Sequence, residues 1–118
     1  PSNKMAFEYL VADYLLKHDL LHVIQLIPQF KNHQYEVLPD LVQEAILLYM
    51  VKTKQSTMSI AGNHLSPKIT QRFKDYSRLY VLYKNRDIKA KKELENSYAD
   101  TFWYYIHFVS PITNKLKL

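Results

Sequence analysis

The chain has 118 residues with one glycine, no cysteine and ten tyrosines, and its formal net charge is +5. Only glycine takes a positive φ without strain, so this composition excludes glycine-rich phosphate loops and dinucleotide fingerprints and disfavours tightly turned sheets. The lack of cysteine excludes disulfides, thiolate zinc sites and a cysteine nucleophile. We therefore predict an all-α fold of five or six helices in antiparallel hairpins.

The first two predicted helices carry apolar residues at three- and four-residue spacing. The first covers about residues 4–17, and a polar break at residues 17–19 separates it from a second over about residues 20–30. Proline lacks the backbone donor that a helix interior needs, and Pro28 lies too deep for the first turn. We therefore expect Pro28 to kink the second helix or to end it early.

A third helix is predicted from Pro39 to about Lys54, because proline fits the first helical position. From residue 55 to residue 65 the chain lacks a periodic pattern and contains the only glycine, Gly62. We interpret residues 55–65 as the longest and most mobile loop. The helices before it form a predicted first layer, residues 4–54.

Ser66 followed by Pro67 is a strong start signal, because serine caps a helix and proline fits its first position. The chain from there on is a predicted second helical layer, residues 66–109. Its helices cover about residues 66–85, 88–96 and 101–109. Residues 1–118 are expected to form a single helical domain. Because the chain begins at Pro1 rather than at methionine, we expect it to be a piece of a longer protein.

A helix, a short break and a second helix make up the repeat unit of tetratricopeptide proteins. With Phe7 at the fourth position of that pattern, the large apolar positions of the first two helices all fit, whereas larger side chains such as Val11 and Val23 replace small ones. A second, degraded copy is visible, since residues 14–20 echo residues 82–88. The pattern predicts tetratricopeptide-like hairpins that pack more loosely than the consensus.

Four parts of the chain carry a more specific resemblance. They are Met5-Ala-Phe-Glu-Tyr-Leu-Val-Ala-Asp-Tyr-Leu-Leu-Lys17 with Asp19-Leu20, Gln43-Glu-Ala-Ile-Leu-Leu-Tyr49, Gln71-Arg-Phe73 and Asp100-Thr-Phe-Trp-Tyr-Tyr105. Together they resemble the C-terminal soluble region of an uncharacterised family of large membrane proteins from Bacteroides-type bacteria. The resemblance implies a tetratricopeptide-like tail on a membrane protein of the cell envelope, and it carries over no catalytic or ligand-binding residue. Without such a parent, the cytoplasm is the alternative location.

The positive charge is concentrated in residues 68–92, where nine lysines and arginines face only two aspartates. Together with the interleaved tyrosines, these cations could bind phosphate backbones and stack bases, or meet the anionic headgroups of a bilayer. The tyrosines also fall on one helix arc, so a solvated basic face above a buried aromatic stripe explains them without a ligand. The candidate surface residues here are Lys74, Arg78, Lys84 and Arg86.

Four adjacent aromatic residues, Phe102-Trp-Tyr-Tyr105, lie in the last predicted helix. They cannot all face one core, because neighbouring side chains on a helix point in different directions. At least one ring should lie at the surface or in a groove, and tryptophan and tyrosine are enriched at binding hot spots. We therefore add Trp103 and Tyr104 to the candidate interaction surface. The alternative is that this helix wedges between two others and buries most of its circumference.

Residues suited to catalysis or metal binding do not form a pattern in this sequence. His18 and His22 have the spacing of two metal ligands, but the helix break falls between them and no third ligand is near. The paired carboxylates fit a solvated helix surface better than an acid/base dyad. We therefore predict no enzymatic activity, no cofactor and no metal site.

The leading functional hypothesis is a scaffold that presents a helix-lined groove to a protein or a peptide, including the rest of its own parent chain. The alternative is binding of nucleic acid or of an anionic membrane surface through residues 68–92. Of these partners we favour protein over nucleic acid. No stretch of the sequence reaches the roughly 18 apolar residues that a membrane span needs.

Overall fold

The computed structural model describes residues 2–55 and 64–112 of the chain. Within these residues the fold is helical and has no strand, so the predicted all-α class is confirmed. The elements are α1 (Ser2–Leu16), α2 (Leu20–Gln25), α3 (Ile27–Asn32), α4 (Asp40–Thr53), α6 (Pro67–Lys84), α7 (Ile88–Tyr98), α8 (Phe102–Tyr104) and a π-helical turn η2 (Tyr105–Val109). Most of the loop predicted over residues 55–65 lies outside the described residues.

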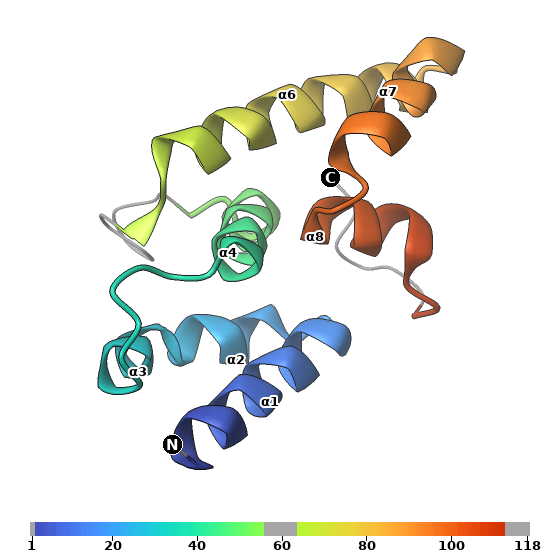
Figure 1. Cartoon of the computed structure of the whole chain (residues 1–118). Coiled ribbons are helices and arrows are strands. Elements are labelled where there is room, and N and C mark those ends of the chain that lie inside the picture. The colour runs from blue at the N-terminus through green and yellow to red at the C-terminus, as the bar shows by residue number, and fades with distance from the viewer. Residues whose placement is uncertain (1, 56–63, 113–118) are drawn as a thin grey trace.

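Helix α4 lies at the centre of the fold, with α1–α3 on one side and α6 and α7 on the other (Figure 1). It contacts α2, α6 and α8, and all of its residues 42–48 are buried. A helix enclosed in this way must be apolar around most of its circumference. One continuous hydrophobic cluster extends from Phe7 on α1 through α4 to Ile106 on η2. Helix α4, which the sequence groups with the first layer, therefore joins the two predicted layers.

The predicted second helix is divided into two helices at Leu26. Helix α2 ends at Gln25, and α3 begins at Ile27 with Pro28 in its first turn. A missing backbone donor has little cost in that turn, because the first N–H groups of a helix have no partner within it. The expected early end of the second helix is confirmed, and Phe30 stays buried beyond the break.

Four helices end in a turn that usually calls for glycine. The left-handed residues after α1, α3, α4 and α6 are His18, Gln34, Lys54 and Arg86, with φ values of 60°, 69°, 58° and 71°. After α1 and after α6, the N–H of the next residue reaches back five positions, from Asp19 to Tyr14 and from Asp87 to Leu82. These are Schellman caps, which satisfy carbonyls at a helix end. In this chain the left-handed position is occupied by residues other than glycine, for which that conformation is unfavourable in free energy.

The sequence echo between residues 14–20 and residues 82–88 coincides with this repeated turn. In both copies an aspartate follows the left-handed residue and caps the next helix. Asp19 accepts a hydrogen bond from the His22 N–H, and Asp87 accepts bonds from the N–H groups at the start of α7. A Schellman cap followed directly by an N-cap therefore joins α1 to α2 and α6 to α7.

Candidate interaction surfaces

Trp103 lies in the core, so the prediction that it belongs to an interaction surface is wrong. Its side chain is fully buried, and its ring packs on Phe73 and Tyr76 of α6 at centroid distances of 5.0 and 5.5 Å. Its indole N–H donates to the Glu44 carbonyl oxygen at 2.9 Å. Helix α8 wedges between α4 and α7, which leaves only Tyr104 and Tyr105 of the four aromatics partly exposed.

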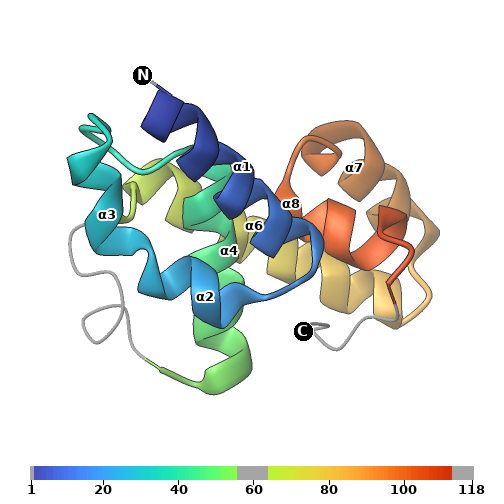
Figure 2. The same ribbon diagram turned by 90° about the horizontal axis from the view of Figure 1, so that it is seen from below.

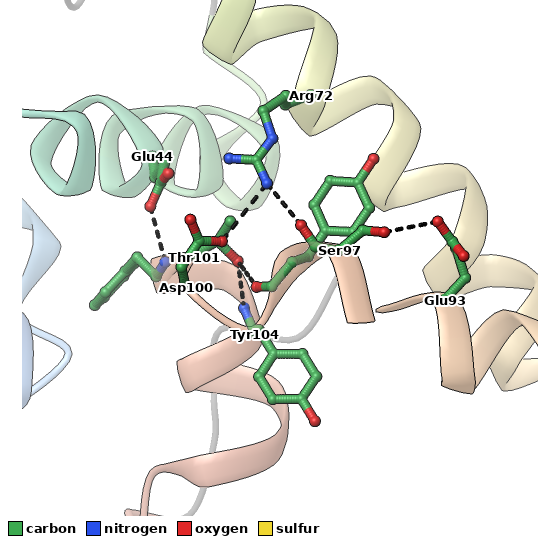
Figure 3. Close-up of polar contacts among 9 residues, drawn as sticks. Glu44, Arg72, Glu93, Ser97, Asp100, Thr101 and Tyr104 are labelled. Carbon is green, nitrogen blue, oxygen red and sulfur yellow. Dashed lines mark hydrogen bonds and ion pairs between the residues drawn. The ribbon is translucent and has the colours of Figure 1, made fainter. Parts of the chain in front are cut away.

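A buried carboxyl group, Glu44 of α4, faces the start of α8 (Figure 3). Glu44 is 4% exposed, and its Oε1 accepts a hydrogen bond of 2.8 Å from the Phe102 N–H. Burial raises the pKa of Glu44 to about 7, although the Phe102 N–H and the charge of Arg72 act in the opposite direction. The Glu44 side chain thus holds α8 against α4. It can accept the Phe102 N–H bond whether the carboxyl group is protonated or ionised, because an acceptor oxygen is present in both states.

Arg72 of α6 ties α6 to the end of α7 beside Glu44 (Figure 3). Its guanidinium donates to the Ser97 carbonyl oxygen at 2.8 Å and lies 3.6 Å from the Asp100 carboxylate. It also lies over the Tyr98 ring, 5.0 Å from the centroid. Of the nine cations in the basic segment, this one serves the packing of helices, and it is not available for a ligand.

The other predicted cations are divided between different parts of the surface. Arg78 pairs with Asp75 one turn away on α6 at 2.9 Å, and both groups are exposed, so the pair adds little stability. Lys74 is also exposed on α6. Lys84 and Arg86 lie farther along, at the turn into α7, where they line a common pocket. The structure therefore brings together two of the four predicted cations.

This basic–aromatic pocket has a volume of about 500 Å³ and lies where α6, α7 and η2 meet. Its cations are Lys84, Arg86 and Lys91, and Asp87 is the one carboxylate among its lining residues. Its other lining residues are Tyr80, Tyr83, Ile88, His107 and Phe108. Lys91 and Phe108 were not among the predicted surface residues, because Lys91 reaches the pocket through the packing of α7 on α6 and Phe108 through the position of η2.

A second, mostly apolar hollow follows α1. Two adjoining pockets of about 200 and 360 Å³ share Ala12 and Leu15 of α1 and Leu41 of α4. One continues toward Phe30 of α3, and the other continues toward Phe102 and Tyr105. Helix α1, which lines both pockets, runs from the N-terminus toward the middle of the molecule (Figure 2). We call the two together the α1 groove. In the part of the chain that the structure describes, its charged lining residues are both acidic, Glu8 and Asp100.

The outer face of α1 extends the groove with exposed apolar side chains. Met5, Tyr9 and Leu16 are 59%, 70% and 56% exposed, and Ala12 lies exposed between them. Their spacing of four, three and four residues places them on one stripe of the helix. A helix that is apolar on both its core face and its solvent face usually has another partner. This second stripe was not predicted from the sequence, where the apolar spacing of the helix was interpreted as a single apolar face.

Three histidines have structural partners, His18, His22 and His107. His18 Nε2 lies 2.9 Å from Ser110 Oγ, and His22 Nδ1 lies 2.7 Å from Asp19 Oδ2. The His107 ring stacks on Tyr80 at 4.0 Å, and its Nδ1 lies 2.6 Å from the Tyr76 hydroxyl. Among the described residues, no three His, Asp or Glu side chains converge in a way that could hold a metal ion.

Comparison with models of known protein families assigns the chain to one family. A model described as a family of unknown function, DUF6057, matches residues 1–109. The chain belongs to DUF6057. An uncharacterised family was expected from the resemblance, and the match covers both predicted layers of this DUF6057 chain. No curated protein and no solved structure matched it. In the described parts of the chain, no helix combines the length and the apolar character that crossing a membrane requires.

Proposed function

We propose that this chain is a protein-interaction module whose α1 groove receives an amphipathic helix of a partner protein. The observation that carries the proposal is the exposed apolar stripe of α1, which continues into the groove beside α4 and α8. Soluble domains seldom expose a contiguous apolar surface that has no partner. A partner helix would present its apolar face at the same three- and four-residue spacing as the stripe.

The charge around the groove defines the partner further. Within residues 2–55 and 64–112, Glu8 and Asp100 are the charged residues that line it, and no cation does. The Asp100 side chain is 78% exposed, so it can meet a cation of the partner. We therefore infer an amphipathic helix whose apolar face is flanked by lysine or arginine. Complementary charge at the rim sets specificity and association rate more than affinity.

The build of the domain supports a tetratricopeptide-like scaffold as part of this proposal. Helix α1 packs against α2, and α6 packs against α7. The same type of turn connects the two helices of each pair. Stacked helical hairpins present extended faces to partners. The resemblance to the soluble tail of large membrane proteins further supports a membrane-bound parent in the cell envelope. Fractionation of cells that produce the native protein tests that location.

The groove is tested by selection from a library of helix-constrained peptides displayed on phage. We expect enrichment of amphipathic helices with flanking lysine or arginine. Their binding should be lost in the Leu16→Lys and Leu41→Lys variants, because both leucines are half-exposed in the groove. Leu21→Lys is the matched control, since Leu21 is 50% exposed on α2 and does not line the groove. Peptides that bind Leu16→Lys as well as the unaltered chain would refute the proposal.

A further inference from the structure

The basic–aromatic pocket has a chemistry that the α1 groove lacks. It combines three cations with aromatic walls in about 500 Å³, a volume typical of small-molecule sites. It is built by α6, α7 and the His107–Phe108 part of η2, whereas the groove is built by α1, α3, α4, α8 and Tyr105, the first residue of η2. The two sites share no lining residue, so a ligand in the pocket is independent of the proposed partner helix.

The charge of the pocket favours an anion. Lys84, Arg86 and Lys91 face one carboxylate, Asp87. That carboxylate already accepts hydrogen bonds from the N–H groups of Lys89 and Ala90, at 3.0 and 3.2 Å. The backbone of Arg86 is fixed by the Schellman cap at the end of α6, so its side chain starts from a defined position. An anion that enters here meets more positive than negative charge.

The aromatic side of the pocket is rigid and partly open. Tyr83 and Phe108 are half-buried, and their rings meet edge to face at 5.2 Å. Behind them, the His107 ring stacks on Tyr80 at 4.0 Å. The π-helical turn η2 brings His107 and Phe108 into the pocket together, and such turns are frequent at functional sites. A planar ring can pack against these faces, as bases do on aromatic platforms.

We propose that this pocket binds a nucleoside monophosphate, with the base against Tyr83 and Phe108 and the phosphate among Lys84, Arg86 and Lys91. A ligand with only carboxylates would leave the aromatic wall unused, and an uncharged ring would leave the cations unused. A longer nucleic acid needs cations in a continuous track. Here Arg72 serves helix packing and Arg78 pairs with Asp75, so the pocket suits a single nucleotide better.

The proposal is tested by calorimetric titration of the full chain with AMP, adenosine and inorganic phosphate at low salt. AMP should bind more tightly than either of its parts, and added salt should weaken it. Lys84→Gln and Lys91→Gln should each weaken AMP binding about two- to fivefold, the range of a partly exposed ion pair. Lys74→Gln and Lys89→Gln remove the same charge outside the pocket lining and should leave binding unchanged.

Several results would overturn the proposal. Equal affinity for AMP and adenosine would show that the phosphate does not contribute to binding. Equal affinity for AMP and inorganic phosphate would show that the base does not contribute. Equal losses in the pocket variants and their controls would show a general charge effect. Binding of a short thymidine oligonucleotide that Lys74→Gln and Lys84→Gln weaken alike would assign the whole basic segment to single-stranded nucleic acid instead. Leu16→Lys, which disables the groove, should leave AMP binding intact.

Discussion

Replacement of Glu44 by glutamine tests the central polar contact of the fold. The carboxyl group is buried between α4 and α8, and burial raises its pKa from an ordinary value of 4.5 to about 7. The native state therefore holds the proton more tightly than the unfolded state does. As the pH rises from 4.5 to about 7, the contribution of Glu44 to the free energy of unfolding falls, and outside that window it is constant.

The size of the effect follows from the two pKa values. Each tenfold change in the proton equilibrium corresponds to about 1.4 kcal/mol, so ionisation of Glu44 in the folded chain costs about 3 kcal/mol. Glutamine keeps an oxygen that can accept from the Phe102 N–H. Above pH 7.5 we therefore expect Glu44→Gln to be more stable than the unaltered chain, by up to about 3 kcal/mol. Below pH 4.5 the two should differ little.

The measurement is urea unfolding of both proteins, followed by circular dichroism, at pH values from 4 to 8. The difference between the two proteins isolates Glu44 from the other titrating groups. Glu95→Gln is the matched control, because it removes an exposed carboxylate of α7 that does not lie between helices. A constant difference between Glu44→Gln and the unaltered chain across this range would refute the reasoning, since it would show that the folded carboxyl group does not titrate near 7.

Two further predictions concern backbone contacts and helix ends. Gln34→Gly should stabilise the chain by about 0.5–1 kcal/mol, because Gln34 has a φ of 69°, which glycine adopts without strain. Gln29→Gly, inside α3, should destabilise the chain by a similar amount. Changes in melting temperature of the same sign for both variants would contradict this. Gln43→Leu should cost about 2–4 kcal/mol in urea unfolding, because the buried amide bonds the Leu38 carbonyl at 2.9 Å and the Ser66 N–H at 2.7 Å. A loss below 1 kcal/mol would show that water replaces these bonds.

Local signals in the sequence predicted the helices well. The start of α6 is capped as expected by Ser66, whose side chain accepts from the N–H groups of Lys68 and Ile69. The break near Pro28 also appears where the proline rule places it. These features depend on neighbours within one turn, which the sequence contains in full. The repeated turn after α1 and α6 is of the same kind, and it appeared in the sequence as an echo.

The interaction surfaces depend on contacts between distant segments, and here the sequence was a weaker guide. Tryptophan is a residue type enriched at binding hot spots, but Trp103 is enclosed by Phe73, Tyr76 and the Glu44 carbonyl. Lys91 enters the pocket only because α7 folds back on α6. The exposed stripe of α1 also has helical spacing in the sequence. When a helix has apolar residues on two faces, however, spacing alone does not show which face packs against the core.

The position of Trp103 gives the domain a built-in optical probe. It is the only tryptophan of the chain, and it contacts α4 and α6 from its place on α8. Its emission will therefore follow the separation of these three helices from one another. Helices α1 to α3 contain no such fluorophore. Emission compared with amide hydrogen exchange in α1 and α2 can thus distinguish a molecule that melts as a whole from one whose N-terminal helices detach first.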